Sequence, residues 1–275
     1  MEHRATGMTD QSPDELLSVA LEAAHVAAAF IRECAPRVRG IIWQEKSATD
    51  FVSEVDLGAE ARILDVVRRR VPAAGVLAEE SAATMTPERL AQGVVFVVDP
   101  LDGTTNFLHG YPEYAVSIGV LTHGVLAAAV VIDIPGHEEF TATAGGGTRC
   151  NGELVYVSTI DQPPRALIGT GFPFKNPADI PAYQSHMSRV MAAVSGVRRA
   201  GAAALDLASV ASGRFDAFWE PMLAPWDIAA GMLLVREAGG VVTDMHGAPG
   251  AVAHTGLVAG NPKMHAWLLT NLNAG

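Results

Sequence analysis

Apolar residues recur at helical intervals in two segments near the start of the chain. Ser12-Pro13-Asp14-Glu15 has the spacing of a capping box, with proline at the first helical position. Apolar side chains then recur at intervals of roughly three or four residues as far as Ile31. Ser53-Glu54-Val55-Asp56 begins a second amphipathic segment, which ends near Pro72. The pattern predicts two long helices.

The middle of the chain has the pattern of a β-sheet. A short strand is predicted at IIW (41–43), and CNGE (150–153) has the composition of a hairpin turn. From about Ser158 the pattern changes to alternating strands and helices. The main strand-like runs are GVLAEE (75–80), GVVFVVD (93–99), YAVSIGVL (114–121), VLAAAVVIDI (125–134) and EFTATA (139–144).

We therefore expect a flexible tail over residues 1–11, an α+β subdomain over residues 12–158 and an α/β subdomain over residues 159–275. The chain has 275 residues, of which 49% are hydrophobic, and this is enough for a large core. No apolar run is long enough to span a bilayer. The start of the sequence is polar and acidic, so we expect no signal peptide and a cytoplasmic protein.

The net charge limits the classes of binding partner, and the cysteine count argues against disulfide and zinc sites. A formal net charge of -11 argues against nucleic acid and anionic membranes as partners. An anionic small substrate stays compatible with this charge, because bound divalent cations reverse the local field. A chain with only two cysteines, Cys34 and Cys150, is not expected to have a disulfide framework, and no Cys/His spacing matches a zinc site.

Acidic side chains follow apolar elements at three separate places. Glu79 and Glu80 follow GVL, Asp99 and Asp102 follow GVVFVV, and Asp227 lies in the first turn of a predicted helix. Each place has an ordinary explanation, which is a solvated turn for the glutamates and helix capping for the aspartates. Element ends are also where α/β folds place ligand sites. The occurrence of all three together favours one shared site.

The segment DPLDGTTNF (99–107) has the residue types of a hard-cation site. Carboxylates without cysteine or clustered histidine suit Mg²⁺, which prefers carboxylate, carbonyl and water oxygens. The spacing lets Asp99 and Asp102 face one point, and Pro100 restricts the chain so that the Leu101 carbonyl can turn inward. A two-metal site needs a shared carboxylate, for which Asp99 is the candidate.

Gly103, Thr104 and Thr105 complete the segment with a phosphate-binding pattern. Glycine lets the backbone approach a ligand, amides at a helix start bind phosphate, and a threonine hydroxyl can orient a water. Metals, amides and a hydroxyl together indicate the hydrolysis of a phosphate ester.

These segments resemble the inositol monophosphatase family of Mg²⁺-dependent, lithium-sensitive phosphatases. DPLDGTTNF resembles the first family signature, and PWDIAAG (225–231) resembles the second, W-D-x-A-A-G. The likeness runs from about residue 15 to residue 272, and it is strongest to bacterial inositol-1-monophosphatases. Three further segments match in family order: KSATDFVSEVD (46–56), AEES (78–81) and RRAGAAALDLASVASGRFDAFWE (198–220).

The resemblance implies a layered αβαβα sugar-phosphatase fold, of the inositol monophosphatase and fructose-bisphosphatase type, that is usually a homodimer. It also implies two or three Mg²⁺ ions in each active site. Glu79, Asp99 and the Leu101 carbonyl would hold one ion. Asp99, Asp102 and Asp227 would hold a second, and Glu79 with waters would hold a weaker third.

The resemblance also assigns catalytic and phosphate-binding roles. Asp56 and Thr104 would form a hydrogen-bonded pair that orients the nucleophilic water, which Glu79 helps to activate through its metal. The amides of Gly103 and Thr104 would bind the phosphate, and Lys46 would lie near the entrance.

Contacts to the alcohol half of the substrate are implied for Asp102, the backbone near Ala203, and Glu220. Two positions depart from the family pattern. Ala224 stands where some animal members carry a histidine near the inositol ring, and Ala202 with Ala203 replaces a more polar pairing. These departures concern the alcohol and leave the metal ligands unchanged.

Three functions are compatible with the sequence. The first is a Mg²⁺-dependent phosphomonoesterase that hydrolyses myo-inositol monophosphate to inositol and phosphate. The second keeps this chemistry but acts on histidinol phosphate, fructose bisphosphate or a nucleotide phosphate, which relatives hydrolyse. The third is mainly a protein-binding regulator, because some bacterial relatives associate with RNA polymerase or ribosome-assembly factors.

Overall fold

The computed structural model describes residues 11–41, 43–47, 50–81, 86–174 and 176–274. The predicted tail at residues 1–11 falls almost wholly outside these ranges. The helices are α1 (Pro13–Cys34), η1 (Ala35–Gly40), α2 (Glu54–Arg70), α3 (Pro87–Leu90), α4 (Thr104–His109), η2 (Pro163–Arg165), η3 (Pro177–Asp179), α5 (Ile180–Met191), α6 (Ala203–Ala211), α7 (Pro225–Glu237) and α8 (Pro262–Leu272).

The strands of the described residues form two main sheets and one short hairpin. The hairpin is β1 (Trp43–Ser47) with β2 (Asp50–Ser53). The larger sheet has the order β3 (Gly75–Ala78), β4 (Val94–Asp102), β5 (Ala115–Thr122), β6 (Val125–Asp133), β7 (Glu138–Thr143), β8 (Gly147–Cys150) and β9 (Glu153–Val155). The smaller sheet has the order β11 (Gly196–Arg198), β10 (Leu167–Thr170), β12 (Ala217–Leu223), β14 (Thr255–Gly260) and β13 (Val241–Thr243).

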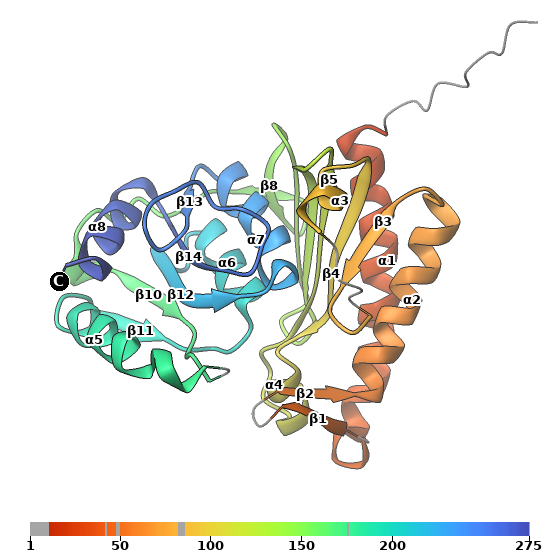
Figure 1. Ribbon diagram of the computed structural model, residues 1–275, viewed down its shortest axis with the longest axis horizontal. Helices are drawn as coiled ribbons and strands as arrows, with labels where there is room; N and C mark the ends of the chain where they lie inside the picture. The colour runs from red at the N-terminus through yellow and green to blue at the C-terminus, as the bar shows by residue number, and fades with distance from the viewer. Residues whose placement is uncertain (1–10, 42, 48–49, 82–85, 175, 275) are drawn as a thin grey trace, which may run out of the picture.

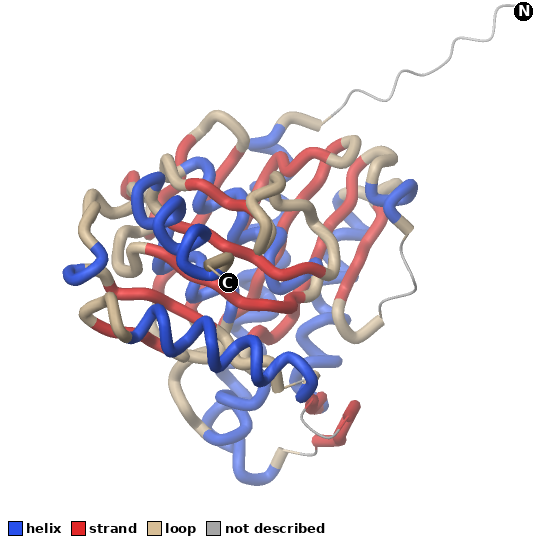
Figure 2. Tube along the Cα trace, turned by 60° about the vertical axis from the view of Figure 1, so that its left-hand side comes forward, coloured by secondary structure: helices blue, strands red, loops and turns tan. Residues whose placement is uncertain are grey.

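The elements stack in five layers, as Figure 1 shows from right to left. Helices α1 and α2 cover one face of the larger sheet, and α6 and α7 lie between the two sheets. Helices α5 and α8 cover the outer face of the smaller sheet. In the turned view of Figure 2, these outer helices lie in front of its strands. The predicted αβαβα fold is confirmed.

Strand alternation explains why the larger sheet needs helices on both faces. Val95 and Val97 of β4 pack toward α6 and α7, whereas Phe96 and Val98 pack toward α1 and α2. All four side chains are buried, because successive strand residues point to opposite faces. The apolar run GVVFVV therefore has the sequence of a strand covered on both sides.

The capping box predicted at the start of the first helix is confirmed. The Ser12 side chain accepts from the Glu15 amide, and the Glu15 carboxylate accepts from the Ser12 amide. Ser53 and Asp56 form the same reciprocal pair at the start of α2. The CNGE turn joins β8 and β9 as predicted. The prediction at IIW was wrong in extent, because Ile41 is not in a strand and Ile42 lies outside the described residues.

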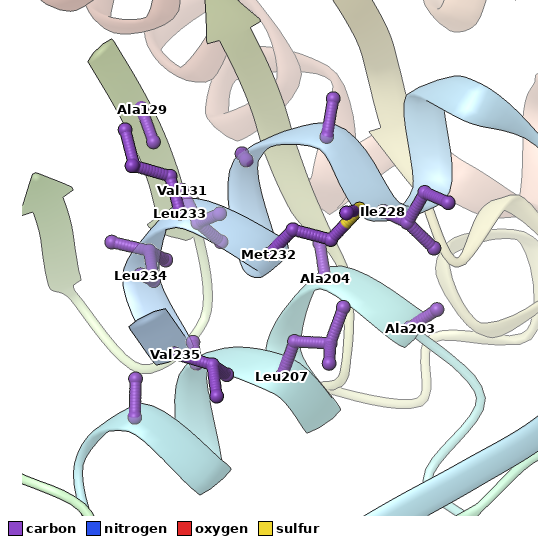
Figure 3. Packing of buried hydrophobic residues seen from close by; sticks show 14 of the residues in the cluster. Ala129, Val131, Ala203, Ala204, Leu207, Ile228, Met232, Leu233, Leu234 and Val235 are labelled. Atoms are coloured by element: carbon purple, nitrogen blue, oxygen red, sulfur yellow. The ribbon is translucent and has the colours of Figure 1, made fainter. Parts of the chain in front are cut away.

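The layer between the sheets makes one continuous core from both halves of the chain. It joins residues of β4 to β7 with residues of α6, α7, β12 and β14. Figure 3 shows apolar side chains of α6 and α7 filling the space between these helices and β6. Because this core crosses residue 158, the division into two subdomains stays a prediction. None of the helices described here is long and apolar enough to cross a membrane.

Gly119 of β5 allows α7 to lie directly on the larger sheet. A Cβ atom at this position would lie 2.7 Å from the Ala229 Cβ and 2.9 Å from the Ala230 nitrogen. Both atoms belong to the buried face of α7, so a side chain at residue 119 would push the helix away. The same helix carries Asp227 in its first turn.

We expect Gly119→Ala to lower the free energy of unfolding by about 2 kcal/mol, because overpacking a rigid core forces backbone shifts. Urea denaturation measures this change. Gly40→Ala is the matched control, since no atom lies within 4 Å of the added methyl group. Equal stability of the Gly119 and Gly40 variants would contradict the tight approach of α7 to β5.

Candidate active site

A bulge at the end of β4 turns two aspartates toward the same cavity. Asp99 lies opposite Ser117 and Asp102 lies opposite Ala115, so β4 has one more residue than β5 between these two pairs. In a regular strand, residues three apart point to opposite faces. The bulge at Pro100, which has no amide hydrogen for the ladder, removes this alternation.

The cavity beside this bulge has a volume of about 770 Å³ and lies between the ends of the two sheets' strands. Its size suits a small organic ligand. Four of its acidic residues come from elements far apart in the sequence: Glu79 after β3, Asp99 and Asp102 in β4, and Asp227 in α7. Every carboxylate that the sequence analysis assigned to a metal thus lines this one cavity. The cavity wall also contains Leu101, Gly103, Thr104 and Glu220.

Burial makes the charges of these carboxylates costly. Asp99 is 2% exposed, and burial together with the charges of Glu79, Asp102 and Asp227 raises its pKa well above the ordinary value. Burial and the charge of Asp227 raise the pKa of Asp102 to about 8. Carboxylates that disfavour one another's ionised form in this way need positive charge to stay ionised at neutral pH.

Backbone amides hold one oxygen of three of these carboxylates. Asp99 Oδ1 accepts from the amide two residues later at 3.0 Å. Asp102 Oδ2 accepts from the Ala204 amide at 2.8 Å, and Asp227 Oδ2 accepts from the Ala224 amide at 2.7 Å. Asp227 therefore does cap the start of α7, as its ordinary explanation required. This hydrogen bond also fixes the Asp227 side chain at the cavity wall.

The donor set has the chemistry of a hard-cation site. Four carboxylates and a main-chain carbonyl offer only oxygen ligands, which suit Mg²⁺. Within the ranges that the structure describes, no three Asp, Glu, His or Cys side chains are already gathered around one point. The four cavity carboxylates nevertheless lie close enough for their charges to contribute to the raised pKa of Asp99 and of Asp102. The residues fit a divalent cation by charge and ligand type.

Asp56 and Thr104 form a partly buried hydrogen-bonded pair beside the cavity. Thr104 Oγ1 lies 2.8 Å from Asp56 Oδ1 and 3.0 Å from the Leu101 carbonyl oxygen. The other oxygen of Asp56 accepts from the amide and the hydroxyl of Ser53. Because a hydroxyl has one proton to donate, donation to Asp56 leaves the Leu101 carbonyl open to another partner. Burial raises the pKa of Asp56, and these hydrogen bonds oppose the rise.

Gly103 has the backbone conformation that only glycine adopts easily. Its φ is 88°, and it precedes Thr104, the first residue of α4. A Cβ atom there would lie 2.7 Å from the Glu113 carbonyl oxygen. Backbone conformation and lack of space therefore both favour glycine at residue 103. Without a side chain there, the first amides of α4 are exposed at the cavity wall.

The residues assigned to the alcohol half come from three elements, and two of them, Asp102 and Glu220, line the cavity. Glu220 of β12 faces the cavity, and its carboxylate lies directly against Gly171. Ala203 is the first residue of α6, next to the Ala204 amide that binds Asp102. The side chain of Lys46 lies outside the described part of the structure.

Aromatic residues at the cavity wall were not assigned from the sequence. The Arg199 guanidinium lies 5.3 Å from the ring centre of Phe172 and 5.2 Å from that of Phe174. On another part of the wall, Trp226 packs edge-to-face on His254 with the ring centres 5.7 Å apart. For Phe172 and Phe174, the sequence offers only the observation that the apolar segment TGFPF (170–174) continues past a predicted strand.

Comparisons with known proteins show the family of the chain. The sequence model of the inositol monophosphatase family matches residues 12–274. The chain belongs to the inositol monophosphatase family. Its predicted family membership is therefore confirmed, and phosphatase chemistry follows from it as the family's general activity.

Relatives of this inositol monophosphatase family member align over nearly their whole length. Nus factor SuhB of Pseudomonas aeruginosa is 44% identical over 261 residues, which are 94% of this chain and 95% of that protein. The crystal structure of the extragenic suppressor protein suhB from Bartonella henselae has a TM-score of 0.89 at 39% identity, covering 94% of this chain and 99% of the other. An inositol monophosphatase from Anabaena (Nostoc) has a TM-score of 0.81 at 34% identity, covering 94% and 95%.

We expect the metal-free protein to lose stability as the pH rises. The folded chain raises the pKa of Asp102 to about 8, so it binds this proton more tightly than the unfolded chain does. The stabilisation is complete below the ordinary aspartate pKa and is lost as the pH rises through about 8. In EDTA, the free energy of unfolding should fall less steeply between about pH 5 and about pH 8 in Asp102→Asn than in the wild type. Parallel curves for the two proteins would contradict the assigned shift.

Proposed function

We propose that this protein is a Mg²⁺-dependent phosphomonoesterase that hydrolyses myo-inositol monophosphate to inositol and phosphate. The supporting observation is the convergence of Glu79, Asp99, Asp102 and Asp227 on one cavity beside the glycine turn at Gly103. Family membership supports the phosphatase chemistry, and the substrate is our inference.

Two or three Mg²⁺ ions would be held by this donor set. Glu79, Asp99 and the Leu101 carbonyl are the ligands proposed for one ion, and Asp99, Asp102 and Asp227 are those for another. Glu79 with waters would hold a weaker third. When bound, Mg²⁺ lowers the pKa of a water ligand and neutralises charge on the phosphoryl group. The chain's own task at this wall is to hold these four carboxylates in place, of which Asp99 and Asp102 are buried.

The other wall residues would orient the reactants. Thr104 donates to Asp56, so its hydroxyl oxygen has lone pairs with a fixed direction and can accept a hydrogen bond from the attacking water. The Gly103 and Thr104 amides would bind phosphate oxygens, and Lys46 would add positive charge near the entrance. This arrangement places the water and the phosphorus together before reaction.

The alcohol half of the substrate would lie between Asp102, the Ala203 backbone and Glu220. A carboxylate such as that of Glu220 accepts hydrogen bonds from sugar or polyol hydroxyls, but it would also pair with a cationic amine. Histidinol phosphate, fructose bisphosphate and nucleotide phosphates are therefore the alternative substrates. The homodimer, the cytoplasmic location, lithium sensitivity and the lack of nucleic-acid or membrane partners stay predictions from the sequence.

A second candidate function is a protein-binding regulatory role. The observation that favours it is the name Nus factor SuhB of a relative that is 44% identical over nearly the whole chain. An acidic chain suits a partner with a basic surface. This role and phosphatase activity need different tests, because a regulator does not require turnover.

Asp99→Asn should reduce phosphate release by at least about a hundredfold, because a shared carboxylate is lost from the reacting centre. A phosphate-release screen over phosphomonoesters, with and without Mg²⁺, measures this loss. The variant should fold at least as stably as the wild type in EDTA, since one buried like charge is removed. Li⁺ at roughly tens of millimolar should inhibit the wild type.

Asp65→Asn is the matched control, because Asp65 lies on α2 with a side chain that is 80% exposed and pairs with Arg69 at the surface. It should keep wild-type activity. Normal turnover by Asp99→Asn would overturn the proposed mechanism. A wild type without activity on any phosphomonoester, but with a specific protein partner retained by Asp99→Asn, would favour the regulatory role.

Glu220→Gln should affect polyol and amine substrates differently. With myo-inositol monophosphate, a neutral acceptor keeps a hydrogen bond to a hydroxyl, so kcat/KM should fall by less than about tenfold. With histidinol phosphate, loss of the charge should lower kcat/KM by more than about tenfold if the amine pairs with Glu220. We expect wild-type kcat/KM to be higher for inositol monophosphate. A preference of the wild type for histidinol phosphate would contradict the proposed substrate.

A further inference from the structure

Helix α2 carries a second buried carboxylate one turn beyond Asp56. Glu60 is 4% exposed and does not line the cavity. A buried carboxylate is costly unless it is hydrogen-bonded or paired. Glu60 Oε2 accepts from the Glu80 amide at 2.8 Å, which joins α2 to the turn that follows β3.

This hydrogen bond fixes one of the two peptide groups that flank the Glu79 α-carbon. The other peptide group is fixed by the Glu79 amide, which donates to the Val98 carbonyl of β4 at 3.1 Å. With both peptide planes anchored, φ and ψ of Glu79 are determined. The direction in which its side chain leaves the backbone is then set by α2 on one side and by β4 on the other.

We propose that Glu60 is a positioning residue that aims the Glu79 carboxylate at the metal site. This inference rests on the proposed function, since it assigns Glu79 to a Mg²⁺ ion. Groups that orient metal ligands without touching the metal commonly change metal affinity by about tenfold or more. Because Glu60 acts through its hydrogen bond to the Glu80 amide, the length of its side chain matters more for Glu79 than its charge does.

The same helix also carries Asp56, which accepts a hydrogen bond from the Thr104 hydroxyl. Asp56 and Glu60 are four residues apart and therefore lie on one face of α2. Asp56 accepts from Thr104, and Glu60 accepts from the Glu80 amide. One rigid helix thus sets the separation between the Thr104 hydroxyl and the Glu79 carboxylate.

Two conservative variants of Glu60 separate the effect of side-chain length from the effect of charge. Glu60→Gln keeps an acceptor oxygen at the same reach without the charge, and Glu60→Asp keeps the charge but shortens the side chain by one methylene. Isothermal titration of the full-length protein with Mg²⁺ measures affinity, and far-UV circular dichroism checks folding. We expect Glu60→Asp to weaken Mg²⁺ binding about tenfold and Glu60→Gln to stay within about threefold of the wild type. At saturating Mg²⁺, kcat should recover in both variants.

Val67→Ala is the control for lost stability, because Val67 is buried on the same helix and lies outside the cavity. It should bind Mg²⁺ as the wild type does. Wild-type affinity in Glu60→Asp, equal losses in both Glu60 variants, or an equal loss in Val67→Ala would each overturn the positioning role. A wild type that binds no Mg²⁺ would overturn the proposed function as well, whereas the other outcomes leave that function standing.

Discussion

Repulsion among buried carboxylates is the constraint on which this structure depends. Asp99 and Asp102 are almost fully buried, and burial together with the charges of neighbouring acidic groups raises the pKa of each above its ordinary value. Such a cluster lowers the stability of the chain when no cation is bound, so the surrounding fold must hold it in place. The β4 bulge and the amides that bind individual carboxylate oxygens supply that support.

The layered fold explains how acidic residues from distant parts of the chain meet. Strand β4 ends at the cavity, and α7 begins there because it packs across the same sheet at Gly119. Helix α6 lies beside α7 and brings the Ala204 amide to Asp102. The core between the two sheets therefore determines the geometry of the site, and a change in that core would move Asp227 relative to Asp99.

The strongest motifs allowed accurate predictions from the sequence. The cap at Ser12, the start of a helix at Ser53, the layered fold and the family could all be predicted, because local sequence patterns and the DPLDGTTNF segment are specific. Asp99 and Asp102 were expected to face one point, but the sequence did not show that a one-residue bulge brings this about. The substrate roles of Ala203 and Glu220 remain predictions.

Several features of the site and the fold could not be predicted, because no local sequence pattern indicates them. Glu60 lies on the apolar side of an amphipathic helix, and its acceptor role depends on an amide 20 residues later. The packing of Arg199 on Phe172 and Phe174 joins a loop after β10 to a loop before α6. The hairpin of β1 and β2 was missed because its strands are short and polar. Tertiary contacts decide such features, so periodicity and propensity do not reveal them.

The most direct test of the account is a crystal structure of the full-length protein grown with Mn²⁺, with the metal located by anomalous scattering. The account predicts neighbouring Mn²⁺ ions in the cavity, with Asp99 bound to more than one of them and with Glu79, Asp102 and Asp227 completing the ligand set. A cavity without Mn²⁺ at a saturating concentration, with the four carboxylates still apart, would contradict it.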